Sequence, residues 1–101
     1  MTVRHIVTWK LSGEAVADRD AQASEIIAAL QPLVGRIPGL RSLEVRRNTL
    51  NHDDNWDLTL VSEHDDAAAL AGYAVHPEHV AAGAVVKQHA VSRACVDFEI
   101  E

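Results

Sequence analysis

The sequence is poor in the features that mark secreted or membrane proteins. It has a single cysteine, Cys95, in 101 residues, which excludes a disulfide within the chain and suits a reducing compartment. No apolar run approaches the ~20 residues that span a bilayer. The residues after Met1 alternate in polarity and do not form the apolar stretch of a signal peptide. We therefore expect a cytoplasmic protein with no membrane partner.

Basic residues are also few. Nine lysines and arginines stand against fifteen acidic residues, which gives a formal net charge of −6. The only basic doublet is Arg46-Arg47, and such a surface repels phosphate backbones. We expect no nucleic-acid partner. Motifs for haem, flavin or nucleotide binding are absent as well, so we expect no cofactor.

The composition is that of an ordinary globular protein, with 48% apolar and 24% charged residues. A chain of this length makes one domain, which we assign to residues 1–101. A domain of this size hides only roughly 60–68% of its unfolded surface, so its stability reserve is modest. Pairing with a second copy would increase the buried surface.

The spacing of apolar residues predicts the order of secondary structure. A period of two predicts strands over residues 3–11, 40–47, 56–64 and 91–100. A period near three and a half predicts helices over residues 14–37, 67–75 and 77–89, the first of them interrupted at Pro32. The order β-α-β-β-α-β defines an α+β, ferredoxin-like fold, in which both helical regions cover one face of a four-stranded antiparallel sheet.

The face of the sheet away from the helices has a mixed character. By alternation we place on it two groups, apolar or small Ile6, Thr8, Thr59, Val61 and Cys95, and acidic Glu44, Glu63 and Asp97. Val96, Phe98 and Ile100 then fall on the opposite side from Asp97. A face wetted on every strand is normally more polar than this. We therefore expect a homodimer in which two such faces stack.

Four segments, in order along nearly the whole chain, match a family pattern: Arg4-His5-Ile6-Val7, Ile37-Pro38-Gly39-Leu40-Arg41-Ser42-Leu43, Tyr73-Ala74-Val75-His76-Pro77-Glu78-His79 and Val96-Asp97-Phe98-Glu99. With them the chain resembles the stress-responsive dimeric α/β-barrel family, often called Dabb. The tyrosine followed by His-Pro-x-His is the most specific element. The resemblance implies a homodimer with its sheets back to back as a barrel, which binds a small organic ligand.

One branch of that family implies a reaction. The chain resembles a polyketide cyclase, which closes a poly-β-keto chain by intramolecular aldol condensation, with His79 as the base and Tyr73 and His5 assisting. The cyclase also has a tyrosine in its first helix, where this chain has Ile27 and Ala28. Many relatives have no assigned activity, so two hypotheses stay open: a stress-associated binding protein, or a cofactor-independent cyclase, lyase or isomerase.

The residues themselves fit both hypotheses. His79 is the third residue of a helix opened by Pro77, where positive partial charge disfavours imidazolium and leaves a neutral proton acceptor. Val7, Trp9 and His76 are predicted to contact the ligand. An enzyme would need a cavity of at least a few hundred Å³ near His79. Alternatively, His76 and His79 only cap and pack the joint between two helices.

A metal site is not expected from the sequence. His76 and His79 have ligand-like spacing, but Pro77 breaks the helix between them and no second close pair completes a tetrahedral set. The acidic loop at 51–57 lacks the central glycine and closing glutamate of a calcium-binding EF-hand. Cys95 has no base beside it in sequence, which favours a buried structural thiol.

Overall fold

The computed structural model describes residues 1–100, and in that range the predicted order of elements is confirmed. Four strands and three α-helices, with one 3₁₀ turn, follow one another as β1 Thr2–Leu11, α1 Val16–Leu30, η1 Gln31–Leu33, β2 Leu40–Arg47, β3 Leu58–His64, α2 Ala67–Val75, α3 Pro77–His89 and β4 Ala90–Ile100. No helix among these residues is long and apolar enough to cross a membrane.

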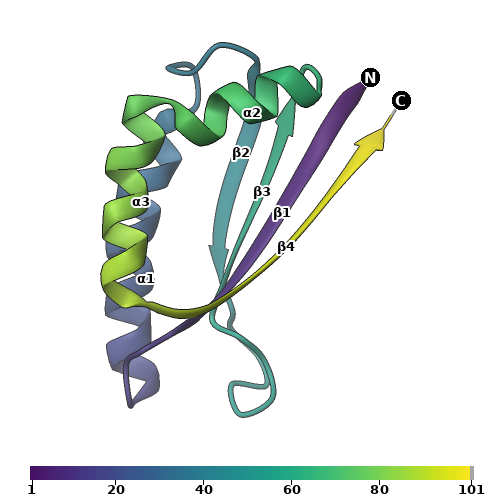
Figure 1. The fold of residues 1–101 in the computed structure, drawn as a ribbon. Helices are drawn as coiled ribbons and strands as arrows, with labels where there is room; N and C mark the ends of the chain where they lie inside the picture. The colour runs from purple at the N-terminus through teal and green to yellow at the C-terminus, as the bar shows by residue number, and fades with distance from the viewer. Residues whose placement is uncertain (101) are drawn as a thin grey trace.

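The strands form one antiparallel sheet in the order β2-β3-β1-β4. Figure 1 shows the helices on one side of this sheet, with β1 and β4 running together so that the two termini lie near each other. The α+β, ferredoxin-like fold is therefore confirmed. The strand β4 is an edge strand, which matters for the site described below.

The first helical segment is shorter than predicted. The helix α1 ends at Leu30, and Pro32 falls in the short 3₁₀ turn η1, because proline cannot donate the backbone hydrogen bond that would continue an α-helix. The chain then turns at Gly35 and Gly39, both with positive φ. The interruption at Pro32 is confirmed, whereas the helical prediction for residues 34–37 is wrong.

The hydrophobic core lies between the helices and the covered face of the sheet. It takes alternate residues from β1 and β3 and one side of α1, including Val7, Trp9, Leu58, Leu60, Ile26 and Leu30. Strand β3 begins at Leu58, so Trp56, predicted as its first residue, lies in the preceding loop and is partly exposed. Burial of these side chains is the main force that holds the helices on the sheet.

Strand β4 has the opposite phase from the one predicted. Asp97 pairs with His5 and Cys95 pairs with Val7, and paired residues of antiparallel strands point to the same side. The placement of Cys95 and Asp97 on the outer face is therefore wrong: both point toward the helices. Val96 and Phe98 occupy the outer face instead, where they are 61% and 40% exposed.

The physical reason is the position of β4 in the sheet. It lies at the edge, and its C-terminal half runs away from α3 (Figure 1). The helical layer therefore buries little of it, and the apolar alternation of β4 does not mark the core side.

Candidate functional site

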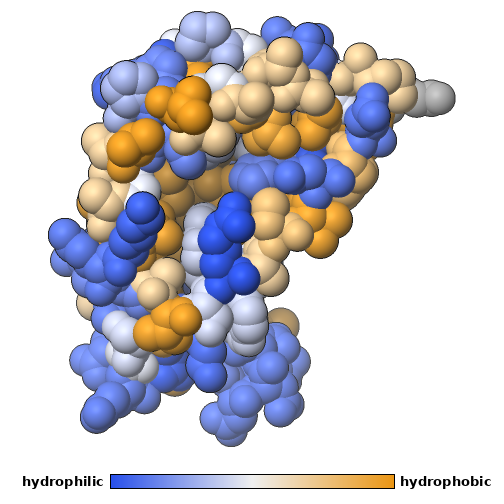
Figure 2. Space-filling view, in the orientation of Figure 1, coloured by the Kyte–Doolittle hydropathy of each residue, from blue (hydrophilic) through white to orange (hydrophobic). Residues whose placement is uncertain are grey.

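A cavity of about 220 Å³ lies between the sheet and the helices α2 and α3. Most of its walls are apolar side chains, contributed by Val7, Trp9, Leu30, Leu60, Leu70 and Val86. Figure 2 shows the molecule hollowed between the helices and the strands, with hydrophilic side chains beside the hollow. A cavity is present near His79 as predicted, but its volume is smaller than the few hundred Å³ expected for an enzyme.

The three residues predicted to be catalytic meet at this cavity. His5 comes from β1, Tyr73 from α2 and His79 from α3, and all three line the cavity. The ring of Tyr73 lies 4.2 Å from that of His79 and 6.2 Å from that of His5, centroid to centroid. Segments almost seventy residues apart in sequence thus supply one side of the cavity.

Two helix caps fix this arrangement. The Asp66 carboxylate accepts a hydrogen bond of 2.8 Å from the Ala69 N–H at the start of α2. His76 Nδ1 accepts one of 3.1 Å from the Glu78 N–H, with Pro77 as the first residue of α3. The joint between the two helices at His76 brings the ring of His79 beside that of Tyr73.

His79 is set up as a neutral imidazole. Its Nδ1 donates to the Ala74 carbonyl oxygen at 3.2 Å, which leaves Nε2 as the nitrogen with a free lone pair. Burial is the largest cause that lowers the pKa of His79, and positive charge at Arg93 contributes, while the hydrogen bond to Ala74 opposes the shift. The lowered pKa of His79 agrees with the neutral state that the sequence predicts.

Tyr73 is the complementary group. Its side chain is buried, and this burial raises the pKa of Tyr73 to about 12. The phenol therefore stays protonated across the physiological range and can donate a hydrogen bond. A neutral imidazole and a protonated phenol in an apolar cavity can together accept one proton and donate another.

A third histidine, His64, packs against Tyr73 and was not among the predicted site residues. It is fully buried, its ring lies 4.8 Å from that of Tyr73, and its Nε2 is 2.9 Å from Ser62 Oγ. Its Nδ1 has no hydrogen-bond partner within residues 1–100. The signal was available, because His64 continues the alternation of Leu58 and Leu60 on the buried face of β3.

Two cations at the cavity were missed as well. Lys87 follows His79 by eight residues on α3, so helical spacing could have placed it on the same side of the helix. Arg93 lies on β4 opposite Trp9. Alternation could not place it there, because the apolar pattern of β4 predicts the opposite phase for this strand.

The predicted ligand contacts divide into two groups. Val7 and Trp9 line the cavity as expected. The structure does not bring His76 into it, because that side chain caps α3 and borders a separate surface groove near Pro38 and Gly39. The capping role considered for His76 is therefore present.

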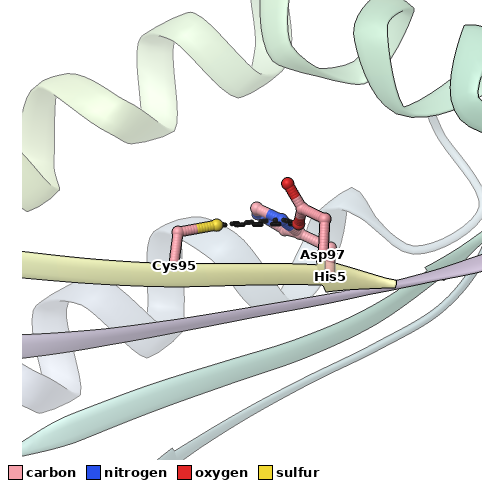
Figure 3. A group of neighbouring side chains, drawn as sticks. All are labelled: His5, Cys95 and Asp97. Atoms are coloured by element: carbon pink, nitrogen blue, oxygen red, sulfur yellow. Dashed lines mark hydrogen bonds and ion pairs between the residues drawn. The ribbon is translucent and has the colours of Figure 1, made fainter.

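A group of side chains from β1 and β4 adjoins the cavity (Figure 3). The His5 Nδ1 and an Asp97 carboxylate oxygen form a close hydrogen-bonded pair. The Cys95 sulfur lies 3.5 Å from the same nitrogen and 3.6 Å from the same oxygen. The three residues point to one another on the helix side of the sheet, and we call them the His5–Cys95–Asp97 cluster.

Together the fold and the cavity define a ferredoxin-like α+β protein with a histidine- and tyrosine-lined pocket between its sheet and helices. The chain belongs to the family described as the stress responsive A/B barrel domain, whose model matches residues 3–100. The predicted family is thus confirmed.

The chain is similar to three proteins that are themselves described as uncharacterized or of unknown function. An uncharacterized protein of Streptomyces coelicolor is 32% identical over 88 residues, which cover 87% of this chain and 90% of that protein. A dimeric ferredoxin-like protein of unknown function from Bacteroides fragilis is 37% identical, with a TM-score of 0.87 over 98% of this chain and 96% of that one. Another dimeric ferredoxin-like protein of unknown function, from Thermobifida fusca, is 27% identical, with a TM-score of 0.82 over 99% of this chain and 92% of that one.

Proposed function

We propose that the protein binds a small organic molecule in the cavity and works as a homodimer. The observation that carries the ligand proposal is the convergence of His5, Tyr73 and His79 on a cavity whose walls are mostly apolar. Ligand sites typically combine such apolar walls with a few polar groups that fix orientation. The volume of about 220 Å³ lies below the range of about 300–1,000 Å³ for drug-sized ligands, so the ligand is small.

The charges define the ligand further. Lys87 and Arg93 are exposed residues that line the cavity of a chain whose formal net charge is −6. An anionic group would interact favourably with them while the apolar part of the ligand contacts Val7 and Leu60. A carbonyl or hydroxyl oxygen on the ligand could then accept a hydrogen bond from Tyr73. This supports a short organic acid as the ligand class.

A matched ligand pair tests this proposal. We expect hexanoate to produce a saturable rise in the melting temperature, and hexanamide, which lacks the charge, a clearly smaller one. The Val7→Trp variant fills the cavity and should lose the response. Val80→Trp, at an exposed α3 position outside the cavity lining, should keep it. No saturable response to hexanoate, or an unchanged response in Val7→Trp, would overturn the ligand proposal.

The outer face of the sheet supports the dimer. Ile6 and Val96 are paired there, with Val61 beside Ile6 on β3 and Phe98 further along β4, and no helix covers this side (Figure 1). Stacking two copies would remove these apolar side chains from water and leave the charged pair of Arg4 and Glu63 near the rim. The similar protein from Bacteroides fragilis is described as dimeric. Light scattering should give about twice the chain mass of 11.0 kDa.

A second candidate function is intramolecular aldol closure, favoured by the contact between His79 and Tyr73. His79 Nε2 would take a proton from the carbon between two carbonyls, and the resulting enolate carbon would attack a carbonyl carbon further along the same chain. A C–C bond forms as that C=O π bond breaks, and Tyr73 donates its hydrogen bond to the developing alkoxide. The alkoxide then receives the proton held by the His79 imidazolium, which restores both groups.

Product analysis tests the cyclase candidate. A reactive poly-β-keto thioester is incubated with wild type and with His79→Ala, and the cyclised and spontaneous products are compared. Loss of one general base typically costs roughly 10²–10⁴-fold in rate. His52→Ala, a histidine in the loop outside the cavity, is the matched control and should act like wild type. Equal product profiles for wild type and His79→Ala would eliminate the cyclase candidate while leaving ligand binding intact.

A further inference from the structure

We infer that the His5–Cys95–Asp97 cluster is a binding site for a divalent cation of the zinc type. The cluster offers one imidazole nitrogen, one sulfur and one carboxylate oxygen, and all three donor atoms lie within 4.8 Å of one another. His5 on β1 faces Asp97 on β4, and Cys95 lies two residues before Asp97 on the same strand, so the hydrogen-bonded sheet holds all three backbones in place. The cluster shares His5 with the cavity, but Cys95 and Asp97 lie outside the cavity lining, so metal binding can be tested through these two residues without a cavity ligand.

The spacing of the donor atoms fits a tetrahedral metal ion. With zinc–sulfur bonds of about 2.3 Å and zinc–nitrogen or zinc–oxygen bonds of about 2.0–2.1 Å, a tetrahedron separates sulfur from either other donor by roughly 3.5 Å. The Cys95 sulfur lies 3.5 Å from His5 Nδ1 and 3.6 Å from Asp97 Oδ1. The nitrogen and the oxygen are closer together because they share a hydrogen bond, and the metal would replace that proton.

The surroundings of the cluster allow the His5 nitrogen and the Asp97 oxygen to move apart when a metal ion binds. The side chain of Asp97 is 44% exposed, so its carboxylate can swing outward to open the space between it and His5. The His5 side chain is nearly buried and fixed, as a ligand that orients the site should be. Three protein ligands leave a fourth position for water, which is the pattern of zinc sites with an open coordination position.

The donor set selects the class of metal. One thiolate and one imidazole favour zinc and similar borderline ions, whereas magnesium and calcium prefer oxygen ligands alone. A thiolate and a carboxylate together cancel the two positive charges of the ion. Burial raises the pKa of the Cys95 thiol and Asp97 adds to that rise, while Arg93 opposes it. The thiol is therefore protonated in the free protein, and metal binding releases its proton to solvent.

Cobalt(II) titration is the decisive experiment. Bound to a tetrahedral site with a thiolate, Co²⁺ shows a sulfur-to-metal charge-transfer band and intense visible bands. Since Cys95 is the only cysteine in the chain, that charge-transfer band reports this residue alone. With the reduced protein we expect both sets of bands to saturate at one Co²⁺ per chain and to disappear when Zn²⁺ is added.

Near-isosteric variants complete the test. Cys95→Ser should abolish the charge-transfer band, and Asp97→Asn should weaken cobalt binding by roughly tenfold or more. The His52→Ala variant should bind like wild type. Circular dichroism shows whether each variant is folded. A wild type without the charge-transfer band, a band that saturates at one Co²⁺ per two chains, or visible bands unchanged in Cys95→Ser would each overturn the site.

Discussion

At the scale of single residues, burial controls the charge of the cavity. Burial is the largest cause that lowers the pKa values of both His64 and His79, and the neighbouring His5 lowers both further. The folded state thus favours the neutral form of His64 and of His79.

This linkage predicts that stability falls with acidification. The unfolded chain binds a proton at His64 with a pKa of about 6.5, while the folded state binds it only at lower pH. The contribution of His64 is therefore fully present above the unfolded pKa and is lost as pH falls through the window below it. Urea unfolding between pH 7 and pH 5 should show this loss for wild type and a smaller loss for His64→Phe.

The control for the histidine experiment is His52→Ala. His52 lies in the loop before β3, outside the cavity, so its removal should leave the slope of stability against pH unchanged. If His64→Phe and wild type lose stability equally on acidification, His64 is not the group whose titration matters. Ring-proton chemical shifts of the individual histidines would show directly which one titrates abnormally low.

Part of the site could be predicted from the sequence at this scale. His5, Tyr73 and His79 were predicted to lie together, and Val7 and Trp9 to line the same space, because strand alternation and helix order place them on facing surfaces. Asp97 was not connected with His5. Ninety-two residues separate the two, and only the register of β1 on β4 makes them neighbours.

At the scale of elements, the position of α2 depends on a close contact with the turn before β2. Gly39 has φ +81°, and a Cβ at this position would lie 2.6 Å from the Cβ of Ala69 on α2. Gly35 has nearly the same φ, +82°, but a Cβ added there would meet no atom within 4 Å. The same substitution at these two glycines therefore distinguishes the cost of backbone strain from the cost of steric crowding.

These glycines give a matched prediction. Gly35→Ala should cost about 1 kcal/mol, because alanine is strained at positive φ. Gly39→Ala should cost roughly 1–3 kcal/mol more, because it also pushes against α2. Thermal or urea unfolding measures both. Equal losses of stability in the two variants would show that α2 moves aside without cost. If α2 is displaced in Gly39→Ala, ligand binding at Tyr73 should also weaken.

Element order and most boundaries were predictable, since β1, β3 and α1 each bury one regular side against the core. The strand β4 was the exception: as an edge strand it is half covered, and its most regular apolar residues, Val96 and Phe98, face away from the helices. Periodicity alone gives which residues share a face, but not which face is covered. Only the pairing with β1 decides that.

At the scale of the whole molecule, the corrected phase of β4 changes the predicted interface. The outer face loses Cys95 and Asp97 and gains Val96 and Phe98, so it is more apolar than sequence alternation predicted. One layer of helices covers one side of the sheet, and the other side carries exposed apolar residues (Figure 1). A second copy of the chain suits this side, because the same surface meets itself across a two-fold axis.

Placing a charge on this face should split the dimer. Val96 is 61% exposed in the single chain and pairs with Ile6 near the middle of the outer face, so Val96→Asp would bury a carboxylate between the sheets. Light scattering should then report about 11.0 kDa in place of about twice that mass, and the melting temperature should no longer rise with protein concentration. Val75→Asp introduces the same charge at a 74% exposed position of α2 and should leave the dimer intact. A Val96→Asp protein that keeps the wild-type dimer mass would move the interface away from this face, because a buried unpaired carboxylate is too costly for a stacked pair of sheets to tolerate.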